Sequence, residues 1–130
     1  MNIAIVGATG NVGRKILEVL EKKELSIDNL YLLASSRSAG SKINFLGNEH
    51  EVLNLETFDF SKAKITFFAA GGKISEKFAE KAAEHSLVID NSSFYRMDPD
   101  VPLIVPQVNS NHLKKIKKNI IANPNCSTAQ

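Results

Sequence analysis

The sequence predicts an α/β fold in which helices cover both faces of a doubly wound, mostly parallel sheet. Three observations lead to this prediction. Short apolar runs of strand length alternate with segments of helical periodicity, a glycine-rich turn joins the first run to the first helix, and no internal repeat or low-complexity linker interrupts the alternation. A chain of 130 residues that is 43% hydrophobic is long enough to bury a sizeable core, so we expect residues 1–130 to form a single domain.

The first half of the chain begins with a strand, a turn and a helix. Residues 2–6 (NIAIV) are a short β-rich run, and apolar positions recur at helical spacing over residues 14–24. Residues 30–34 (LYLLA) are almost continuously apolar, which is typical of a strand covered on both faces. Two further runs predict a small hairpin, residues 43–47 and 51–55.

The second half continues the alternation. It predicts a core strand over residues 64–70, an amphipathic helix over 73–86 and a strand over 87–90. An irregular stretch with three of the four prolines follows over residues 91–109. A helix over residues 110–118 and a last strand over 119–123 complete the prediction. Asn109 or Ser110 is the candidate N-cap of the helix before Lys118. The inward face of the helix over 73–86 is expected to consist of Phe78, Ala79, Ala82 and Ala83.

Composition bears on partners and location. The chain has 16 basic and 14 acidic side chains, and its one dense basic run, residues 114–118, has no interleaved aromatic residue. That run is typical of a solvated helix face, so no nucleic-acid partner is expected. The longest apolar runs are far shorter than the ~18 residues of a membrane span, so no membrane partner is expected either. Met1 leads into an apolar strand without a targeting segment, and one cysteine forms no internal disulfide, which favours a cytoplasmic location. No metal site is expected.

The glycine-rich turn lies between the first strand and the first helix. Its glycines follow a G-x-x-G-x-x-G pattern. Glycines here permit φ > 0 and close backbone approach, so that the free N–H groups of the helix can face a pyrophosphate. The pattern predicts a Rossmann-like dinucleotide site, although spaced glycines also occur in simple tight turns. The candidate cofactor contacts are Gly7, Thr9, Gly10, Asn11, Val12 and Gly13.

The end of the second predicted strand bears on the choice of cofactor. NAD enzymes usually place Asp or Glu about 20 residues after the glycines, against the ribose 2′-hydroxyl. The stretch here is ASSRS and contains no acid. Ser35, Ser36, Arg37 and Ser38 offer hydroxyls and a guanidinium, which suit a 2′-phosphate. NADP is therefore favoured over NAD, the alternative being a solvated loop with an ordinary surface arginine.

The only cysteine, Cys126, lies in the stretch NPNCST directly after the last predicted strand. This position is at the carboxyl edge of the sheet, where open α/β sheets bind ligands. If the residues after it begin a helix, the positive end of that helix lowers the pKa of the thiol and favours a nucleophilic thiolate. The alternative is a small buried hydrophobic residue. The polar neighbours Asn123, Asn125, Ser127 and Thr128 count against that alternative.

Four motifs, in this order and at these separations, resemble the aspartate-semialdehyde dehydrogenase family: GATGNVG from Gly7, SSRSAG from Ser35, IDNSSFYRMDPDVPLIVPQVN from Ile89 and NPNCSTAQ from Asn123. The resemblance covers essentially the whole chain, and the last two motifs are highly specific. It departs at Tyr95, where a small residue is common, and at Gln107, where glutamate is usual.

The resemblance implies a reductive NADPH reaction that converts an aspartyl phosphate into aspartate semialdehyde and phosphate. This reaction is a step towards lysine, threonine, methionine and isoleucine. Cys126 would be the nucleophile that forms a thioacyl-enzyme. Asn125 would help to hold the acyl group or its oxyanion. The full-length protein would be a homodimer or homotetramer.

The same resemblance implies where the substrate phosphate and the nicotinamide bind. The phosphate cradle would be formed by Asn91, Ser92, Ser93 and Arg96. The nicotinamide would approach a strand end formed by Ala70, Gly71 and Gly72. The resemblance also implies a second domain, absent from this chain, with the acid/base histidine, an arginine for the substrate carboxylate and most of the dimer interface. We therefore expect residues 1–130 alone to bind NADP weakly and not to turn over. The histidines of this chain are expected at the surface: His50, His85 and His112.

Two other readings stay open. An N-acetyl-glutamyl-phosphate reductase shares the thiol chemistry, but its cysteine normally lies in a PGCY-like context rather than NPNCST. An NADP-binding sensor or atypical short-chain reductase-like module would suit GATGNVGRKI. Short-chain reductase chemistry needs a lysine four residues after a tyrosine, and the residues at that distance from Tyr31 and Tyr95 are Ser35 and Pro99. A sensor without chemistry is not excluded by this test.

Overall fold

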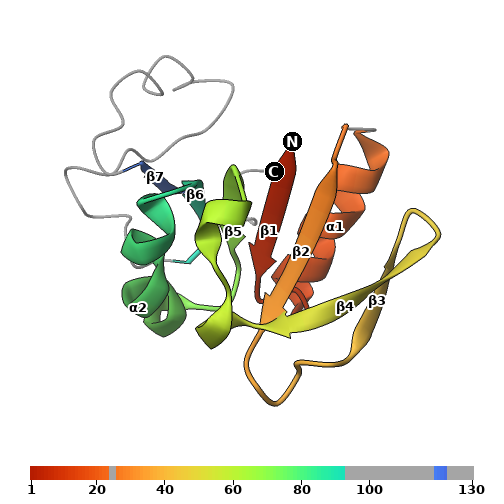
Figure 1. Ribbon diagram of the computed structural model, residues 1–130, viewed down its shortest axis with the longest axis horizontal. Helices are drawn as coiled ribbons and strands as arrows, with labels where there is room; N and C mark the ends of the chain where they lie inside the picture. Colours follow the sequence, from red (N-terminus) through yellow and green to blue (C-terminus); the bar gives the residue numbers. More distant parts are fainter. Residues whose placement is uncertain (24–25, 93–118, 123–130) are drawn as a thin grey trace.

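The computed structural model describes residues 1–23, 26–92 and 119–122 (Figure 1). In this part of the chain, seven strands form one sheet with the order β3-β4-β2-β1-β5-β6-β7. The strands are β1 (Asn2–Val6), β2 (Asn29–Ala34), β3 (Lys42–Phe45), β4 (Asn48–Asn54), β5 (Ile65–Phe68), β6 (Leu87–Asp90) and β7 (Ile120–Ala122). The helices described are α1 (Asn11–Lys22), α2 (Gly72–Ala83) and the short 3-10 helices η1 (Leu55–Thr57) and η2 (Phe60–Lys62).

The sheet reverses its strand order at β1. The chain moves from β1 outward to β2 and β4, and then returns to place β5, β6 and β7 on the other side of β1. All strand pairs are parallel except β3 with β4. The predicted doubly wound, mostly parallel α/β fold is therefore confirmed. In such sheets the reversal point, here between β1 and β5, is where ligands bind at the carboxyl ends of the strands.

The register aligns the carboxyl ends of the central strands. Val6 pairs with Leu33 on one side and with Phe68 on the other. Phe68 in turn pairs with Asp90, and Asp90 with Ala122. The segments that leave β1, β2, β5, β6 and β7 therefore start at the same edge of the sheet.

The two α-helices cover opposite faces of the sheet because side chains alternate along β1. Ile3 and Ile5 belong to the core cluster that contains Leu17 of α1. Ala4 and Val6 belong to the cluster that contains Phe78 of α2. The predicted inward face of this helix is confirmed, since Phe78, Ala79 and Ala82 are buried and Ala83 packs against the same cluster.

The helix boundaries differ from the expected ones at the start of α1 and at the end of α2. The first helix begins at Asn11 rather than at residue 14, because Gly10 is its N-cap and accepts the Arg14 N–H at 3.0 Å. α2 ends at Ala83 rather than at residue 86, because the His85 and Ser86 N–H groups both donate to Ala82 O in a closing turn. The helix expected before Lys118 lies outside the described residues.

The chain passes from β2 to β4, its parallel neighbour, through the hairpin strand β3. The predicted hairpin is confirmed as β3 and β4, which pair antiparallel. Leu46 and Gly47 form its tight turn with φ of 50° and 81°, as expected of a two-residue hairpin loop. This connection therefore contains an edge strand in the place where βαβ units usually carry a helix.

The segment between β4 and β5 adds aromatic side chains to the α2 face. The sequence analysis did not predict η1 or η2. Phe58 lies between Tyr31 and Phe60, with ring centroids 5.2 and 5.3 Å away. Phe60 stacks on Phe68 with centroids 6.3 Å apart. These rings fill the space between the sheet and α2, and fix the exit of the chain from β4. None of the helices described is long and apolar enough to cross a membrane.

Candidate functional site

A cleft of about 350 Å³ opens at the carboxyl edge of the sheet, at the reversal point between β1 and β5. Its walls come from the ends of β1, β2 and β5, from η1, and from the first two turns of α2. Six of the residues predicted to contact a cofactor line it: Gly7, Thr9, Gly10, Ser35, Ser38 and Ala70. Three segments far apart in the sequence thus meet where the topology predicts a ligand.

The glycine-rich turn packs more tightly than a chain with side chains permits. Gly7 has φ +88°, and a β-carbon on it would lie 2.7 Å from Ala69 O. A β-carbon on Gly13 would lie 2.2 Å from Gly7 O. Real β-carbons do not approach backbone atoms so closely, so both positions require glycine. The result is a bare backbone surface between the turn and the end of β5.

Gly13 is therefore a structural part of the turn rather than a wall of the cleft. Val12 faces a separate groove of about 250 Å³ with Ile16 and Phe67. Asn11 is exposed at the start of α1 and is likewise absent from the lining of the cleft. The cleft is therefore not lined by these three predicted contacts.

Two helix N-termini face this edge of the sheet. α1 starts after Gly10 and α2 after Gly71, and neither start carries a side-chain cap or an acidic residue in its first turn. Helix N-termini carry partial positive charge and free N–H groups. The edge is therefore suited to an anionic ligand such as a pyrophosphate. Gly71, with φ of 92°, and Gly72 begin α2 directly beside Ala70.

The serine-rich segment after β2 forms a compact turn at the mouth of the cleft. The Ser38 and Ala39 N–H groups both donate to Ser35 O at 3.0 Å. Ser35 and Ser38 line the cleft, whereas Ser36 and Arg37 are exposed at the tip of the turn. The turn therefore presents hydroxyls inward and leaves the guanidinium in solvent.

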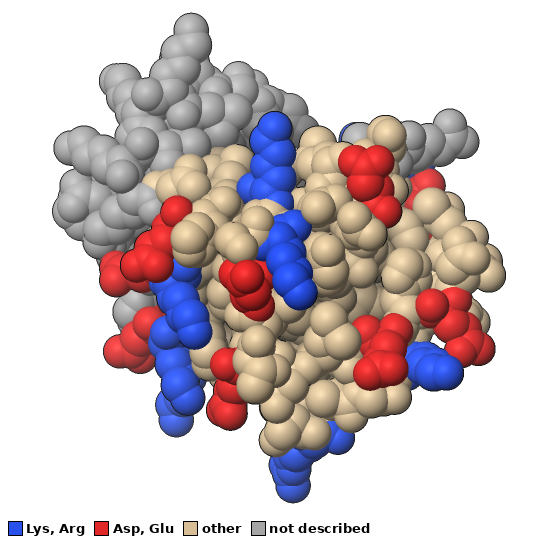
Figure 2. All heavy atoms as spheres, viewed as in Figure 1, with Lys and Arg blue, Asp and Glu red and all other residues tan. Residues whose placement is uncertain are grey.

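The cleft also contains an acid that the sequence analysis did not identify. Glu56, from η1 at the end of β4, lines the cleft, and Lys77 of α2 lies opposite at 4.0 Å. The prediction of the cofactor considers only the end of β2, because NAD enzymes usually place an acid there. Glu56 comes from the next parallel strand, which the register brings beside β2. On the face of the molecule seen in Figure 2, the basic and acidic side chains of the described residues are interspersed rather than gathered by sign.

The chain leaves β6 at the carboxyl edge of the sheet, where Asn91 is anchored to the end of β5 and lines the groove beside Val12 and Phe67. The Asn91 N–H and side-chain amide both donate to Phe68 O, at 2.9 and 3.3 Å. Ser92 is buried, and its hydroxyl donates to Asp90 Oδ2 at 2.8 Å. Asn91 and Ser92 are the described part of the predicted phosphate cradle; Ser93 and Arg96 lie outside the described residues.

The predicted nucleophile and its neighbour, Cys126 and Asn125, also lie outside the described residues. β7 ends at Ala122, which pairs with Asp90 at the carboxyl edge. The chain therefore reaches the correct edge four residues before Cys126.

Two of the three histidines can be located. His85 is exposed in the turn after α2, as expected. His50 is half-buried on β4, where its ring stands edge-on to Phe45 with centroids 6.1 Å apart. His112 lies outside the described residues. Among the residues that the structure describes, no three side chains of the metal-binding types gather in one place.

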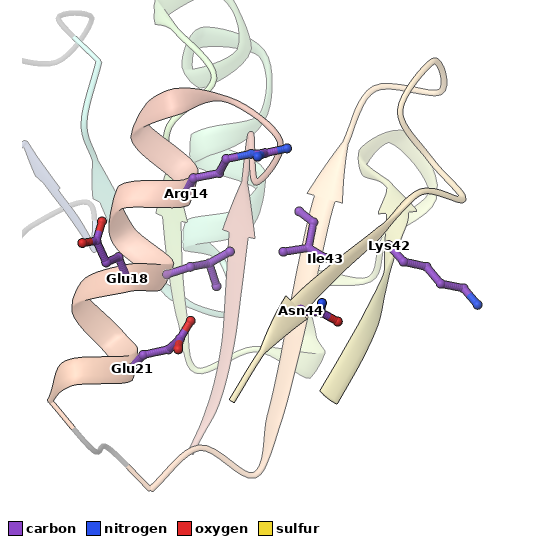
Figure 3. Close-up of a pocket in the computed structure, with 7 residues that line it drawn as sticks. Arg14, Glu18, Glu21, Lys42, Ile43 and Asn44 are labelled. Atoms are coloured by element: carbon purple, nitrogen blue, oxygen red, sulfur yellow. The ribbon is translucent and has the colours of Figure 1, made fainter. Parts of the chain in front are cut away.

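Another groove lies between α1 and β3, and it shares no lining residue with the cleft (Figure 3). Leu17 and Ile43 line it together with charged residues of both signs. Figure 3 shows Glu18 pointing away from β3 and Lys42 pointing away from α1. Glu18 is paired instead with Lys15 and Lys22 on its own helix, at 3.8 and 3.4 Å.

The fold and the cleft together define a dinucleotide-binding domain of the Rossmann type. Comparison with known families places the chain more narrowly, because the family model described as semialdehyde dehydrogenase, NAD binding domain, matches residues 2–116. The chain belongs to this family, and the resemblance to aspartate-semialdehyde dehydrogenases is confirmed.

Curated relatives and solved structures agree with this family. The chain is 50% identical to an aspartate-semialdehyde dehydrogenase of Shewanella sp. (strain DB6705), over 99% of this chain and 39% of the relative. It is 51% identical to aspartate-semialdehyde dehydrogenase 2 of Vibrio cholerae, with the same coverage. The chain thus spans about 39% of the length of these relatives.

Among solved structures, aspartate semialdehyde dehydrogenase II of Vibrio cholerae, complexed with ASA, superposes with a TM-score of 0.94 at 51% identity. The match covers 98% of this chain and 42% of that one. A probable aspartate-semialdehyde dehydrogenase of Pseudomonas aeruginosa gives a TM-score of 0.86 at 32% identity, covering 98% and 38%.

Proposed function

We propose that this chain is the NADP-binding part of an aspartate-semialdehyde dehydrogenase. The whole enzyme would reduce an aspartyl phosphate to aspartate semialdehyde and phosphate. The observation that carries the proposal is the cleft at the reversal point of the sheet, where Gly7 leaves bare backbone between β1 and β5. The identity to named dehydrogenases supports the choice of substrate class.

The residues of the cleft fit a dinucleotide. A pyrophosphate would lie on the turn from Gly7 to Gly10, where the start of α1 offers uncapped N–H groups. The adenosine end would extend towards Ser35 and Ser38, and the nicotinamide end towards Ala70 and the start of α2. When bound, the reduced nicotinamide supplies the hydride for the reaction.

The preference for NADP over NAD is proposed to depend on the turn over Ser35–Ser38. Arg37 is exposed at its tip, so its guanidinium is available to a 2′-phosphate above the cleft. Guanidinium groups bind phosphate through two parallel charge-assisted hydrogen bonds. Glu56 is balanced by Lys77, which limits its repulsion of an anionic cofactor.

Covalent chemistry is assigned to Cys126. Its thiolate sulfur would attack the acyl carbon of the aspartyl phosphate, and the bond from that carbon to the phosphate oxygen would break as inorganic phosphate leaves. Asn125 would donate to the oxyanion during this step. After hydride addition to the same carbon, the carbon–sulfur bond would break and return the thiolate while the aldehyde leaves. The β7 pairing with β6, which brings the chain to the correct edge before Cys126, supports this role.

The substrate phosphate is proposed to bind near Asn91, Ser92, Ser93 and Arg96. The described part of this segment is anchored to the end of β5, next to Ala69 and Ala70 of the cleft. The hydroxyl hydrogen of Ser92 is committed to Asp90 in this structure. To donate to the substrate phosphate, the Ser92 hydroxyl would have to rotate away from Asp90. Without that rotation, Ser92 would only position the residues next to it.

Dinucleotide titration tests the cofactor assignment. NADPH fluorescence, and competition by NADP⁺, NADH and NAD⁺, would be measured on this chain at low ionic strength. We expect weak binding with NADP(H) preferred over NAD(H), and no turnover of aspartate semialdehyde without the rest of the enzyme. Absence of any dinucleotide binding would contradict the cofactor assignment, and equal binding of both cofactors would contradict the NADP preference.

The remaining expectations belong to the whole enzyme. A cytoplasmic place in the synthesis of lysine, threonine, methionine and isoleucine follows from the proposed reaction. A homodimeric or homotetrameric assembly is proposed on the family resemblance alone, and sedimentation of the complete enzyme would test it.

A further inference from the structure

A buried carboxylate behind the cleft is the starting point. Asp90 is the last residue of β6, and its exposed fraction is 0%. In the described part of the chain no lysine, arginine or histidine pairs with it. Removing a carboxylate from water without a cation is costly unless hydrogen bonds replace the lost hydration. The donors around Asp90 are therefore informative.

Among the described residues three donors surround this carboxylate, and they come from two separate segments. Oδ1 accepts the hydroxyl of Ser75 at 2.6 Å and the N–H of Ser92 at 3.0 Å. Oδ2 accepts the hydroxyl of Ser92 at 2.8 Å. Ser75 is itself 0% exposed. Asp90 thus ties the first turns of α2 to the segment that leaves β6.

The two segments border different hollows of the molecule, since α2 lines the cleft and Asn91 lines the separate groove beside Val12 and Phe67. Ile74, Lys77 and Phe78, the neighbours of Ser75 on α2, line the cleft, whereas Ser75 faces the sheet. The N–H of Ser75 closes the start of α2 on Gly71 O at 3.2 Å. On the other side, Ser92 follows Asn91, which is held on Phe68 at the end of β5.

We propose that Asp90 is a positioning residue that couples the α2 wall of the cofactor cleft to the segment that leaves β6. This inference rests on the proposed function. Asp90 holds the start of α2 in a fixed position relative to Asn91 and Ser92. The nicotinamide end of the cofactor would lie against the start of α2. The substrate phosphate would lie beside Asn91 and Ser92. Ordering of α2 by a bound dinucleotide is then transmitted through Ser75 and Asp90 to Ser92, without a contact between Asp90 and either ligand.

The structure provides a matched control in another buried hydroxyl pair, which joins β5 to the residue before β6. Thr66 Oγ1 and Ser86 Oγ lie 2.8 Å apart, and their residues are 0% and 1% exposed. Ser86 directly precedes β6, whereas Asp90 ends it, so this hydroxyl pair lies away from the carboxyl edge. Ser86→Ala therefore removes a buried hydroxyl of the same kind without touching the proposed linkage.

The test compares Ser75→Ala, Asp90→Asn, the double variant and Ser86→Ala in this chain. Amide exchange would be followed by NMR at the Ser92 N–H and over α2, with and without NADPH, and NADPH affinity would be measured on the folded proteins. We expect Ser75→Ala to speed exchange at Ser92 by about tenfold, although it changes neither Ser92 nor Asp90. We expect affinity to fall about three- to tenfold, with the double variant no weaker than Asp90→Asn. Ser86→Ala should lower stability but change neither readout.

The outcomes separate this inference from the proposed function. Unchanged exchange at Ser92 in Ser75→Ala, or an equal effect of Ser86→Ala, would overturn the linkage. Ser75→Thr, which keeps the hydroxyl, should restore slow exchange if the linkage holds. If the unaltered chain bound no dinucleotide, the proposed cofactor assignment and the coupling to it would fail, while exchange at Ser92 would still decide whether Asp90 joins the two segments.

Discussion

Gly13 on the first turn of α1 lies directly against the carbonyl of Gly7. A β-carbon on Gly13 would stand 2.2 Å from that oxygen and 2.8 Å from Ala8 Cα. The contact therefore sets the distance between the start of α1 and the turn that follows β1.

Gly13→Ala tests this contact. We expect a loss of about 3 kcal/mol in unfolding free energy, because overpacking against backbone cannot be relieved by a side-chain rotation. Gly10→Ala is the control, since its β-carbon would lie an ordinary 3.5 Å from Gly7 O. That variant should lose about 1 kcal/mol or less, as an N-cap substitution. Urea unfolding followed by circular dichroism measures both. Equal losses in the two variants would contradict the packing argument.

Arg37→Ala tests the proposed cofactor preference. Removing a charged hydrogen-bond donor from a phosphate should weaken NADP(H) binding about tenfold or more and leave NAD(H) binding nearly unchanged. Arg14→Ala is the control, because Arg14 is an exposed arginine that lines the groove between α1 and β3 rather than the cleft. Fluorescence titration with both reduced cofactors gives the two affinities. A parallel loss for NADPH and NADH in Arg37→Ala would argue against a 2′-phosphate contact.

Glu56→Gln tests whether the acid in the cleft opposes an anionic ligand. The ion pair with Lys77 is 4.0 Å long and both side chains are about two-thirds exposed, so stability should change by no more than about 0.5 kcal/mol. NADPH affinity should rise a few-fold at low salt, and the gain should shrink as salt is added. Glu49→Gln provides the control, since Glu49 pairs with Lys42 at 3.7 Å on the hairpin, away from the cleft. Weaker NADPH binding in Glu56→Gln would indicate that Glu56 accepts a hydrogen bond from the cofactor.

Alkylation of Cys126 by iodoacetamide tests the proposed nucleophile. Cys126 is the only cysteine, so every labelled molecule reports this thiol. If the helix expected after Cys126 forms, its positive end lowers the pKa of the thiol, and the rate midpoint should fall well below the ~8.5 of a free thiol. The same chain in urea should return to the free value. A thiol that hardly reacts in the folded chain would favour the sensor reading over the dehydrogenase.

Asp59 gives the fold a small dependence on pH. Its pKa is lowered chiefly by the hydroxyl of Ser61 and next by the Ser61 N–H, which donate to Oδ1 at 2.7 and 3.0 Å. A lowered folded pKa stabilises the fold above the unfolded pKa, near pH 4, and this contribution is lost as the pH falls through the folded value. NMR titration should place the midpoint of Asp59 lower in the folded chain than in urea. Ser61→Ala should raise the folded midpoint of Asp59. An unchanged midpoint in this variant would contradict the assignment of the shift to Ser61.

The sheet could be predicted from the sequence because its signals are local. The alternation of Ile3 and Ile5 with Ala4 and Val6 already divides β1 between two faces, and the glycines after it mark the crossover to α1. The order of the strands was not predicted, because it depends on contacts between distant segments. Helix ends were predicted less accurately, because Gly10 serves as an N-cap without a polar side chain.

Parts of the site that depend on register could not be predicted. Glu56 enters the cleft only because β4 pairs beside β2, and Ser75 reaches Asp90 only because α2 packs over β6. Neither residue belongs to a pattern in its own neighbourhood of the sequence. The 3-10 helices share this property, since Phe58 and Phe60 are buried by partners such as Tyr31 rather than by a local periodicity.

The hairpin that takes the place of a helix also determines how the molecule meets its neighbours. In the described part of the sheet β3 is an outermost strand of four residues, and Lys42 and Asn44 on it are exposed. Short outer strands that carry lysine are poor templates for the backbone of another chain. The open flank of this sheet therefore resists edge-to-edge aggregation, which protects a protein whose other strands are rich in valine, isoleucine and phenylalanine.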